Sequence, residues 1–233
     1  MEQSIAKQKA RELKIDKTQV VREYWELIVL KGLYDSRFGR HLIFKGGTAL
    51  RLAYGSPRFS EDLDFSLTKD VIKGKFSSFI EKMITPFPEM VLTDLEEKYY
   101  TYLAEIKVTQ DYLPFPFRIK IEISKRETRD YQWESKLLNS PATVTQVMGQ
   151  VATLEQIYKD KMACLEGRAK PKDLFDLWYI SEKLSIPYTP QEISLNKREV
   201  VRDLRKYLPS DFWPAIGGLI KWKESNYLRR SKR

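Results

Sequence analysis

The 233-residue sequence has only one cysteine, Cys164, and one histidine, His41. A single cysteine excludes a disulfide framework within the chain and a zinc site built from cysteines. A single histidine argues against zinc catalysis by histidine ligands and against a serine–histidine–aspartate triad. An enzyme of this composition has to use carboxylates, lysines and backbone amides. We expect Cys164 to be packed among apolar neighbours on a helix, and His41 to lie at the surface or in a cap.

Long apolar runs are also missing from the sequence. No segment approaches the roughly 20 apolar residues that span a bilayer. The N-terminal residues MEQSIAKQKARELK contain neither the apolar stretch nor the small-residue cleavage site of a secretory signal. We therefore expect a cytoplasmic protein without membrane association. Hydrophobic residues make up 42% of the chain, which is enough for a sizeable core and excludes disorder of the whole chain.

Positive charge is in excess and is unevenly distributed. The chain has 41 Lys and Arg against 32 Asp and Glu, a net charge of +9. Residues 1–150 carry +3 and residues 151–233 carry +6, and the terminal segment KWKESNYLRRSKR alone carries +5. A basic segment of this kind favours contact with a phosphate backbone. A frayed, solvated chain end is an equally good interpretation of the tail by itself.

Hydrophobic periodicity predicts a mixed α/β part at the start of the chain. Residues 1–40 carry helical spacing, with Thr18 as the candidate N-cap of the main helix. Residues 42–67 have the pattern of a strand, a glycine turn, a short helix closed by Gly55 and a second strand. Helical spacing over residues 69–85 follows, and then three β-rich runs before residue 125.

After Pro141 the spacing of the hydrophobic residues is typical of helices. Four candidate helices cover residues 154–168, 171–184, 190–208 and 212–224. We therefore expect an α+β fold, in which a mixed β-sheet flanked by helices is followed by a C-terminal helical bundle. The boundary falls near residue 150, so that residues 1–150 form the α/β domain with its N-terminal helical segment and residues 151–233 form a helical domain.

Residues 44–67, FKGGTALRLAYGSPRFSEDLDFSL, carry the most informative chemistry. Strand residues two apart project to one face, so Asp62 and Asp64 point together while Leu63 and Phe65 face the core. Converging carboxylates repel each other, and a divalent cation between them relieves that repulsion. The glycines allow the backbone to approach a phosphate at a helix N-terminus. Each motif alone is commonly a turn or a solvated strand end, but together they predict a site for a triphosphate and Mg²⁺.

The strand RIKIEIS, residues 118–124, offers a third carboxylate. Its isoleucines share one face, which leaves Glu122 on the other face beside Lys120. A phosphoryl-transfer site with two metal ions needs more ligands than two aspartates supply. An amphipathic strand with Glu122 facing water is the alternative.

Two predicted helices bring further charged residues. Lys161 and Arg168 are seven residues apart and share a helix face, and Asp173 and Asp176 are three apart on the next helix. Lys161 and Arg168 can both point at phosphates. The alternative is a helix hairpin in which these charged residues form surface ion pairs.

Arg58 and Ser60, just before the aspartate pair, either contact a nucleotide or stabilise their own loop. The tyrosines Tyr99, Tyr100 and Tyr102 either stack on bases or pack across strands.

The motifs GGTAL…RFSEDLDF, KIEIS and LEQIYKDKMACLEGRAKPKDLFDLWYI occur in this order over roughly residues 40–180. In this respect the sequence resembles the AbiEii/AbiGii and MenT-like nucleotidyltransferase toxins of the DNA polymerase beta superfamily. The resemblance implies a nucleotidyltransferase domain whose active site the C-terminal helices help to form. It implies the metal ligands Asp62, Asp64 and Glu122. The catalytic candidates are Asp62, Asp64, Lys161 and Asp176. The nucleotide-binding candidates are Lys45, Gly46, Gly47, Thr48, Arg58, Ser60, Arg168 and Asp173.

The same resemblance implies a function. It implies transfer of NMP from an NTP, with two Mg²⁺ ions or Mn²⁺, to an RNA acceptor, namely the 3′ end of tRNA. This transfer would block translation, and a separately encoded antitoxin would neutralise the toxin. The alternatives are a nucleotidyltransferase acting on a protein or a small molecule, and a catalytically inert RNA-binding protein of the same fold. Unneeded carboxylates that repel each other would cost stability, which argues against the inert protein.

Overall fold

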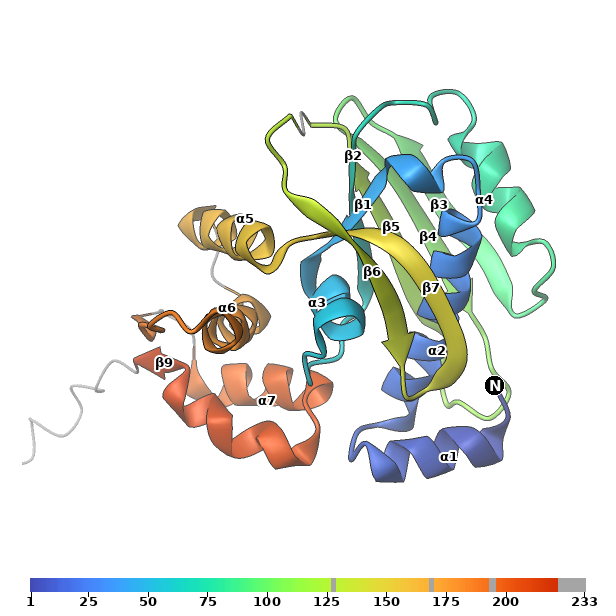
Figure 1. Ribbon diagram of the computed structural model, residues 1–233. Helices are drawn as coiled ribbons and strands as arrows, with labels where there is room; N and C mark the ends of the chain where they lie inside the picture. Colours follow the sequence, from blue (N-terminus) through green and yellow to red (C-terminus); the bar gives the residue numbers. More distant parts are fainter. Residues whose placement is uncertain (127–128, 168–169, 193–195, 222–233) are drawn as a thin grey trace, which may run out of the picture.

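The computed structural model describes residues 1–126, 129–167, 170–192 and 196–221, and its centre is a seven-stranded mixed sheet (Figure 1). The strand order is β3-β4-β5-β2-β1-β7-β6. The strands of this sheet are β1 (Leu42–Lys45), β2 (Asp62–Leu67), β3 (Met90–Glu97), β4 (Thr101–Val108), β5 (Phe117–Ser124), β6 (Trp133–Ser140) and β7 (Thr143–Ala152). The α-helices are α1 (Gln3–Glu12), α2 (Lys17–Tyr34), α3 (Gly46–Tyr54), α4 (Phe76–Ile84), α5 (Leu154–Gly167), α6 (Pro171–Leu184) and α7 (Lys197–Tyr207).

The middle of the sheet mixes strand directions. Strand β1 pairs antiparallel with β2 and parallel with β7, and β2 pairs parallel with β5. Two antiparallel hairpins, β3–β4 and β6–β7, form the outer parts. The predicted α+β architecture, a mixed sheet flanked by helices and followed by C-terminal helices, is therefore confirmed.

Helices α2, α3 and α4 cover one face of the sheet (Figure 1). Tyr34 of α2 lies directly over Gly149 of β7, where a Cβ atom would come within 2.6 Å of the ring. Arg51 of α3 forms an ion pair with Glu23 of α2 at 2.6 Å. Because these helices occupy the apolar face, the polar side chains of β1, β2 and β5 project from the opposite face.

The C-terminal helices pack on one another and against the edge of this sheet. Their apolar cluster consists of Leu174, Phe175, Tyr179, Val200, Leu204, Leu208, Ile216 and Leu219. The Tyr179 hydroxyl donates to the Tyr54 carbonyl at 2.7 Å, and the Phe59 N–H donates to the Tyr207 carbonyl at 2.8 Å. Helices α6 and α7 are thereby fixed against α3 and the loop that leads into β2.

Several predicted boundaries are wrong for local reasons. Asp16, not Thr18, caps α2, because its carboxylate accepts the Thr18 N–H at 2.7 Å. The helix predicted from residue 69 begins only at Phe76, after Gly74 adopts a φ of +66°. The short helix closed by Gly55 is confirmed, with Gly55 in the left-handed conformation.

Two segments differ in kind from the prediction. Residues 133–152 form the β6–β7 hairpin, which the periodicity hides because its outward face includes apolar residues such as Val144, 98% exposed. The helix predicted over 212–224 is instead the 3₁₀ helix η2 (Ser210–Gly218), where Pro214 and two glycines oppose α-helix formation. It leads into β9 (Ile220–Lys221), which pairs with β8 (Gln191–Glu192). Residues 222–233, most of the basic tail, lie outside the described residues.

No helix among the described residues is long and apolar enough to cross a membrane.

Candidate active site

Asp62 and Asp64 lie side by side on β2, as the strand period predicts. Leu63, which lies between the two aspartates, and Phe65, which follows them, are fully buried. The two carboxylates point to the opposite face of the sheet. In the parallel pairing of β2 with β5, Asp64 stands beside Glu122, so the third predicted carboxylate falls in the same row.

The electrostatics of this row are unfavourable in the free protein. Burial, followed by repulsion from Asp62 and Glu122, raises the pKa of the Asp64 carboxyl to about 6. The positive charges of Lys161 and Lys45 oppose the rise. A bound cation would remove the repulsion, and paired carboxylate oxygens are the ligands that Mg²⁺ prefers. The donor chemistry of Asp62 and Asp64 therefore fits a divalent metal.

Glu122 is less ready to act as a ligand. Its carboxylate accepts a hydrogen bond from the ammonium group of Lys120 at 2.7 Å, and its side chain is 41% exposed. Within the described part of the chain, no three acidic, histidine or cysteine side chains form a preassembled metal cluster. Lys120 therefore competes with a metal ion for one of the two carboxylate oxygens of Glu122.

The glycine turn lies against the same row of side chains. Gly46 has a φ of +78°, and a Cβ atom there would come within 2.5 Å of a carboxylate oxygen of Asp64. A Cβ atom at Gly47 would come within 2.1 Å of the Arg58 guanidinium. Both glycines are therefore required by the close approach of the first turn of α3 to these side chains. The hydroxyl of Thr48, itself buried, donates to the Asp62 carbonyl at 2.6 Å and fixes the start of β2.

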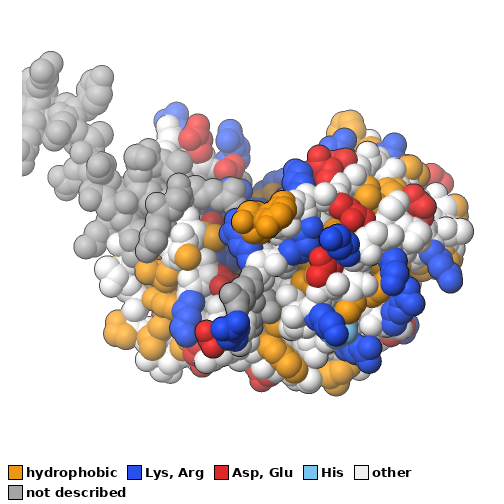
Figure 2. Space-filling view, turned by 90° about the horizontal axis from the view of Figure 1, so that it is seen from above, with side chains coloured by type: hydrophobic (Ala, Val, Ile, Leu, Met, Phe, Trp, Pro, Cys, Tyr) orange, Lys and Arg blue, Asp and Glu red, His pale blue; other side chains and the backbone are white. Residues whose placement is uncertain are grey.

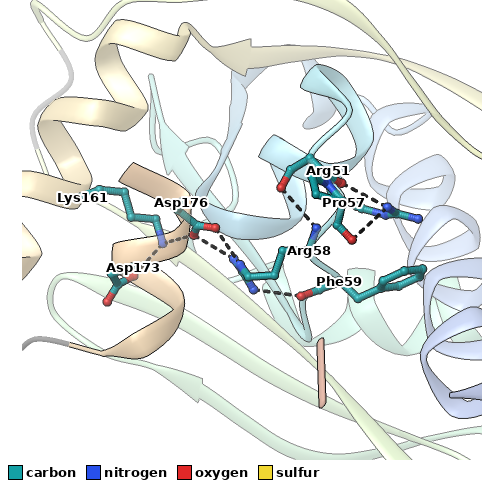
Figure 3. Close-up of polar contacts among 8 residues, drawn as sticks. Arg51, Pro57, Arg58, Phe59, Lys161, Asp173 and Asp176 are labelled. Atoms are coloured by element: carbon teal, nitrogen blue, oxygen red, sulfur yellow. Dashed lines mark hydrogen bonds and ion pairs between the residues drawn. The ribbon is translucent and has the colours of Figure 1, made fainter. Parts of the chain in front are cut away.

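A buried charge network joins α5, α6 and the loop before β2 (Figure 3). The Arg58 guanidinium donates two hydrogen bonds to Asp176, at 2.6 and 2.7 Å, although the side chains are only 1% and 0% exposed. Lys161 contacts both Asp173 and Asp176 at 2.7 Å. Sequence reasoning selected all four residues but not the pairing of Arg58 with Asp176.

The network keeps its members charged. Burial alone favours the neutral form of Asp176, yet the charges of Arg58 and Lys161 lower the pKa of its carboxyl below the ordinary value. Burial likewise opposes the charge of Lys161, but Asp176 and Asp173 raise its pKa overall. Lys161 is therefore a protonated ammonium group in a defined position.

These elements surround a cavity of about 560 Å³ between the sheet and helices α5 and α6. Ten predicted site residues line it: Lys45, Gly46, Gly47, Arg58, Ser60, Asp62, Asp64, Glu122, Lys161 and Asp173. Thr48 and Asp176 lie behind this lining and contact it through hydrogen bonds. Arg168 lies outside the described residues.

Other cavity residues had no role in the prediction, namely Arg126, Asp160 and Lys170. The position of Arg126, two residues past the strand that carries Glu122, could have identified it as a neighbour of the site. Cys164 also corrects a prediction, because it is exposed and lines the cavity instead of packing in the core. Helical periodicity placed it among apolar neighbours in sequence but did not reveal that α5 turns that side toward the cavity.

Removal of Asp176 tests the importance of the buried network. We expect Asp176→Ala to destabilise the protein by about 3–5 kcal/mol, because it leaves Arg58 and Lys161 as buried charges without their main partner. Urea unfolding measures the loss. The matched control is Asp203→Ala, whose ion pair with Arg202 is long, at 3.5 Å, and more than half exposed; it should cost less than about 1 kcal/mol. Equal losses in the two variants would contradict the structural role of the network.

Comparison with known proteins identifies the family to which the chain belongs. The family model "Nucleotidyl transferase AbiEii toxin, Type IV TA system" matches residues 28–214. JHP933 from Helicobacter pylori is similar in structure, with a TM-score of 0.53 and 26% identity over 72% of this chain and 68% of that one. MenT4, a nucleotidyltransferase toxin from Mycobacterium tuberculosis, shares the fold, with a TM-score of 0.53 and 19% identity over 80% of this chain and 63% of that one. No curated protein matches the chain. Because the family match spans well over half of the sequence and includes the whole cavity, the chain belongs to the AbiEii family of nucleotidyltransferase toxins, which act in type IV toxin–antitoxin systems.

Proposed function

We propose that the protein transfers a nucleoside monophosphate from an NTP to a hydroxyl group of RNA, with the 3′ end of tRNA as the acceptor. Blocked translation would be the toxic outcome, in the cytoplasm, and a separately encoded antitoxin would prevent it. The observation that carries the proposal is the row of Asp62 and Asp64 facing a cavity that α3 enters with its N-terminus. That arrangement suits a metal-bound triphosphate.

Asp62 and Asp64 would hold Mg²⁺, with Glu122 as the third candidate ligand. We expect two ions, and Mn²⁺ could replace them. The chemistry that such ions supply when bound is neutralisation of the triphosphate and a lower pKa for the attacking hydroxyl.

The chain's own groups bind and orient the nucleotide. In the reaction, the acceptor hydroxyl group gives up its proton to solvent and its oxygen forms a bond to the α-phosphorus. The bond from that phosphorus to the bridging oxygen breaks, and pyrophosphate leaves. The backbone at Gly46 and Gly47 and the positive end of α3 face the phosphates. Lys161, fixed by Asp173 and Asp176, supplies positive charge where negative charge develops. Asp176 then acts as a positioning residue for Lys161 and Arg58.

The charge of the cavity favours a polyanionic acceptor. Its lining includes seven basic and five acidic side chains. A cationic small molecule such as an antibiotic would be better served by an acidic cleft. A protein acceptor and a catalytically inert RNA-binding protein remain alternatives that one experiment separates.

Transfer of label from each α-labelled NTP, in the presence of Mg²⁺ and total RNA, tests the proposal. We expect label in tRNA, and we expect Asp64→Asn to lower the rate by about 10³-fold because it removes a metal ligand that acts in the transition state. The control is Asp94→Asn, an exposed strand aspartate on β3, which should transfer at the wild-type rate. Label in protein or small molecules, or no label at all, would contradict RNA transfer, and an active Asp64→Asn would contradict the site.

The raised pKa of Asp64 predicts a gain of stability from the same substitution. An aspartate with an unfolded pKa near 3.8 and a folded pKa of about 6 binds more protons in the folded state, so stability falls as the pH rises through 6. In EDTA at pH 8, Asp64→Asn should therefore raise Tm by about 3–8 °C. The gain should shrink as the pH falls from 6 toward 4 and vanish below about pH 3, where both states are protonated. A gain that is independent of pH, or equal in Asp94→Asn, would show that charge repulsion is not its cause.

A further inference from the structure

A second polar surface adjoins the active-site cavity at the end of the sheet where β2 and β5 finish. We call it the edge patch and define it by its described residues: Lys69, Tyr99, Tyr100, Lys125 and Arg126. We propose that the edge patch binds unpaired nucleotides of the RNA acceptor just upstream of its reacting 3′ hydroxyl. This inference rests on the proposed function and names the part of the protein that holds the acceptor strand.

Packing of the core does not explain the positions of Tyr99 and Tyr100, because both side chains are exposed to solvent. Tyr99 and Tyr100 lie in the turn between β3 and β4, and they are 84% and 57% exposed. Their rings meet edge to face, with centroids 4.5 Å apart. Tyr102 is different, because it is fully buried against Phe76. Of the two interpretations of this tyrosine group, cross-strand packing therefore applies to Tyr102, and Tyr99 and Tyr100 present ring faces to solvent.

Lys125 links this turn to the end of the strand that carries Glu122. Its backbone N–H donates to the Tyr100 carbonyl at 2.8 Å, and its ammonium group donates to the Lys98 carbonyl. Lys125 is three residues beyond Glu122, or about 10 Å along the strand direction. A few nucleotides of a single strand can therefore span the distance from the tyrosines to the row of carboxylates.

The surface beside Lys125, where β2 and β5 end, is basic. A cavity of about 450 Å³ there is lined by Leu67, Thr68, Lys69, Asp70, Lys125, Arg126 and Arg129. Among the described lining residues the one acidic side chain, Asp70, accepts a hydrogen bond from the Tyr102 hydroxyl at 2.8 Å. Arg126 lines this cavity and the active-site cavity as well, so the two adjoin at this residue. Figure 2, which views this end of the molecule, shows Lys and Arg side chains gathered beside the hollow between the helical part and the sheet.

Exposed aromatic rings beside a basic groove are the chemistry that binds single-stranded nucleic acid. Each base has a flat face that stacks on tyrosine, and lysine and arginine contact the backbone phosphates. A duplex keeps its bases stacked inside the helix and cannot use the tyrosines in this way. The edge patch therefore fits an unpaired RNA end better than a double-stranded segment.

Fluorescence anisotropy with a labelled oligoadenylate of about eight nucleotides tests the proposal. The experiment uses the full chain with Asp64→Asn, so that no transfer occurs. Adding Tyr99→Ala or Tyr100→Ala should raise Kd by about 5- to 150-fold for each lost base stack. The control is Phe115→Ala, an aromatic residue 76% exposed between β4 and β5, which should leave Kd within about twofold. Unchanged Tm in all variants confirms that they are folded.

The salt dependence of binding tests the basic residues separately. Lys69→Gln with Arg126→Gln should reduce the slope of log Kd against log salt concentration by about 1.4, or 0.7 for each lost phosphate contact. The matched control is Lys7→Gln with Arg11→Gln on exposed positions of α1, which removes the same charge elsewhere. An equal change in both pairs would overturn the proposal, because it would indicate an effect of net charge alone.

The binding readout does not depend on catalysis, so the two proposals can fail separately. If the wild type labels RNA but the tyrosine variants bind the oligonucleotide as tightly as their parent, the edge patch is wrong and the function stands. If the wild type transfers no nucleotide but the tyrosine variants lose binding, the function is wrong, and the edge patch stands as a site for single-stranded RNA but not for an acceptor. A duplex of the same length that binds as well as the single strand would also overturn the edge patch.

Discussion

The buried pair between Arg58 and Asp176 is the interaction on which the rest of the site depends. It joins residues 118 positions apart, one in the loop before β2 and one in α6. Charges are costly to remove from water, so such a pair persists only when its hydrogen bonds are complete. Lys161 and the Phe59 carbonyl complete it, and the absence of a side chain at Gly47 gives the guanidinium its space. One ion pair thus fixes the position of α3, of the loop and of α6.

A second constraint lies in the neighbouring row of carboxylates. Asp62 and Asp64 are held close enough to repel each other, and Asp64 has the raised pKa that follows from burial and this repulsion. The free protein therefore sacrifices some stability at neutral pH to keep a site prepared for a cation. In the proposed reaction, the lysine-rich cavity wall provides the opposite charge for the triphosphate, and the network behind it keeps Lys161 protonated and in place. The family membership and the charge arrangement lead to the same type of reaction.

The sequence predicted those features of the site that depend on local periodicity. The shared face of Asp62 and Asp64 follows from the strand period, and the left-handed Gly55 ends its helix as expected. The pairing of Arg58 with Asp176 could not be predicted, because it depends on how α6 packs. Periodicity also placed Cys164 in the core, since it cannot tell which side of a helix a cavity will occupy. The β6–β7 hairpin was missed because its apolar residues do not mark one buried face.

The central claim is that Asp62 and Asp64 hold the metal-bound triphosphate of an NTP. A crystal structure of the protein soaked with Mg²⁺ and a non-hydrolysable NTP analogue tests it most directly. We predict electron density for a cation at about 2.1 Å from carboxylate oxygens of both aspartates. The phosphates should lie against the first turn of α3, with Lys161 still in contact with Asp173 and Asp176. A nucleotide bound elsewhere, or a cation held by other side chains, would contradict the account.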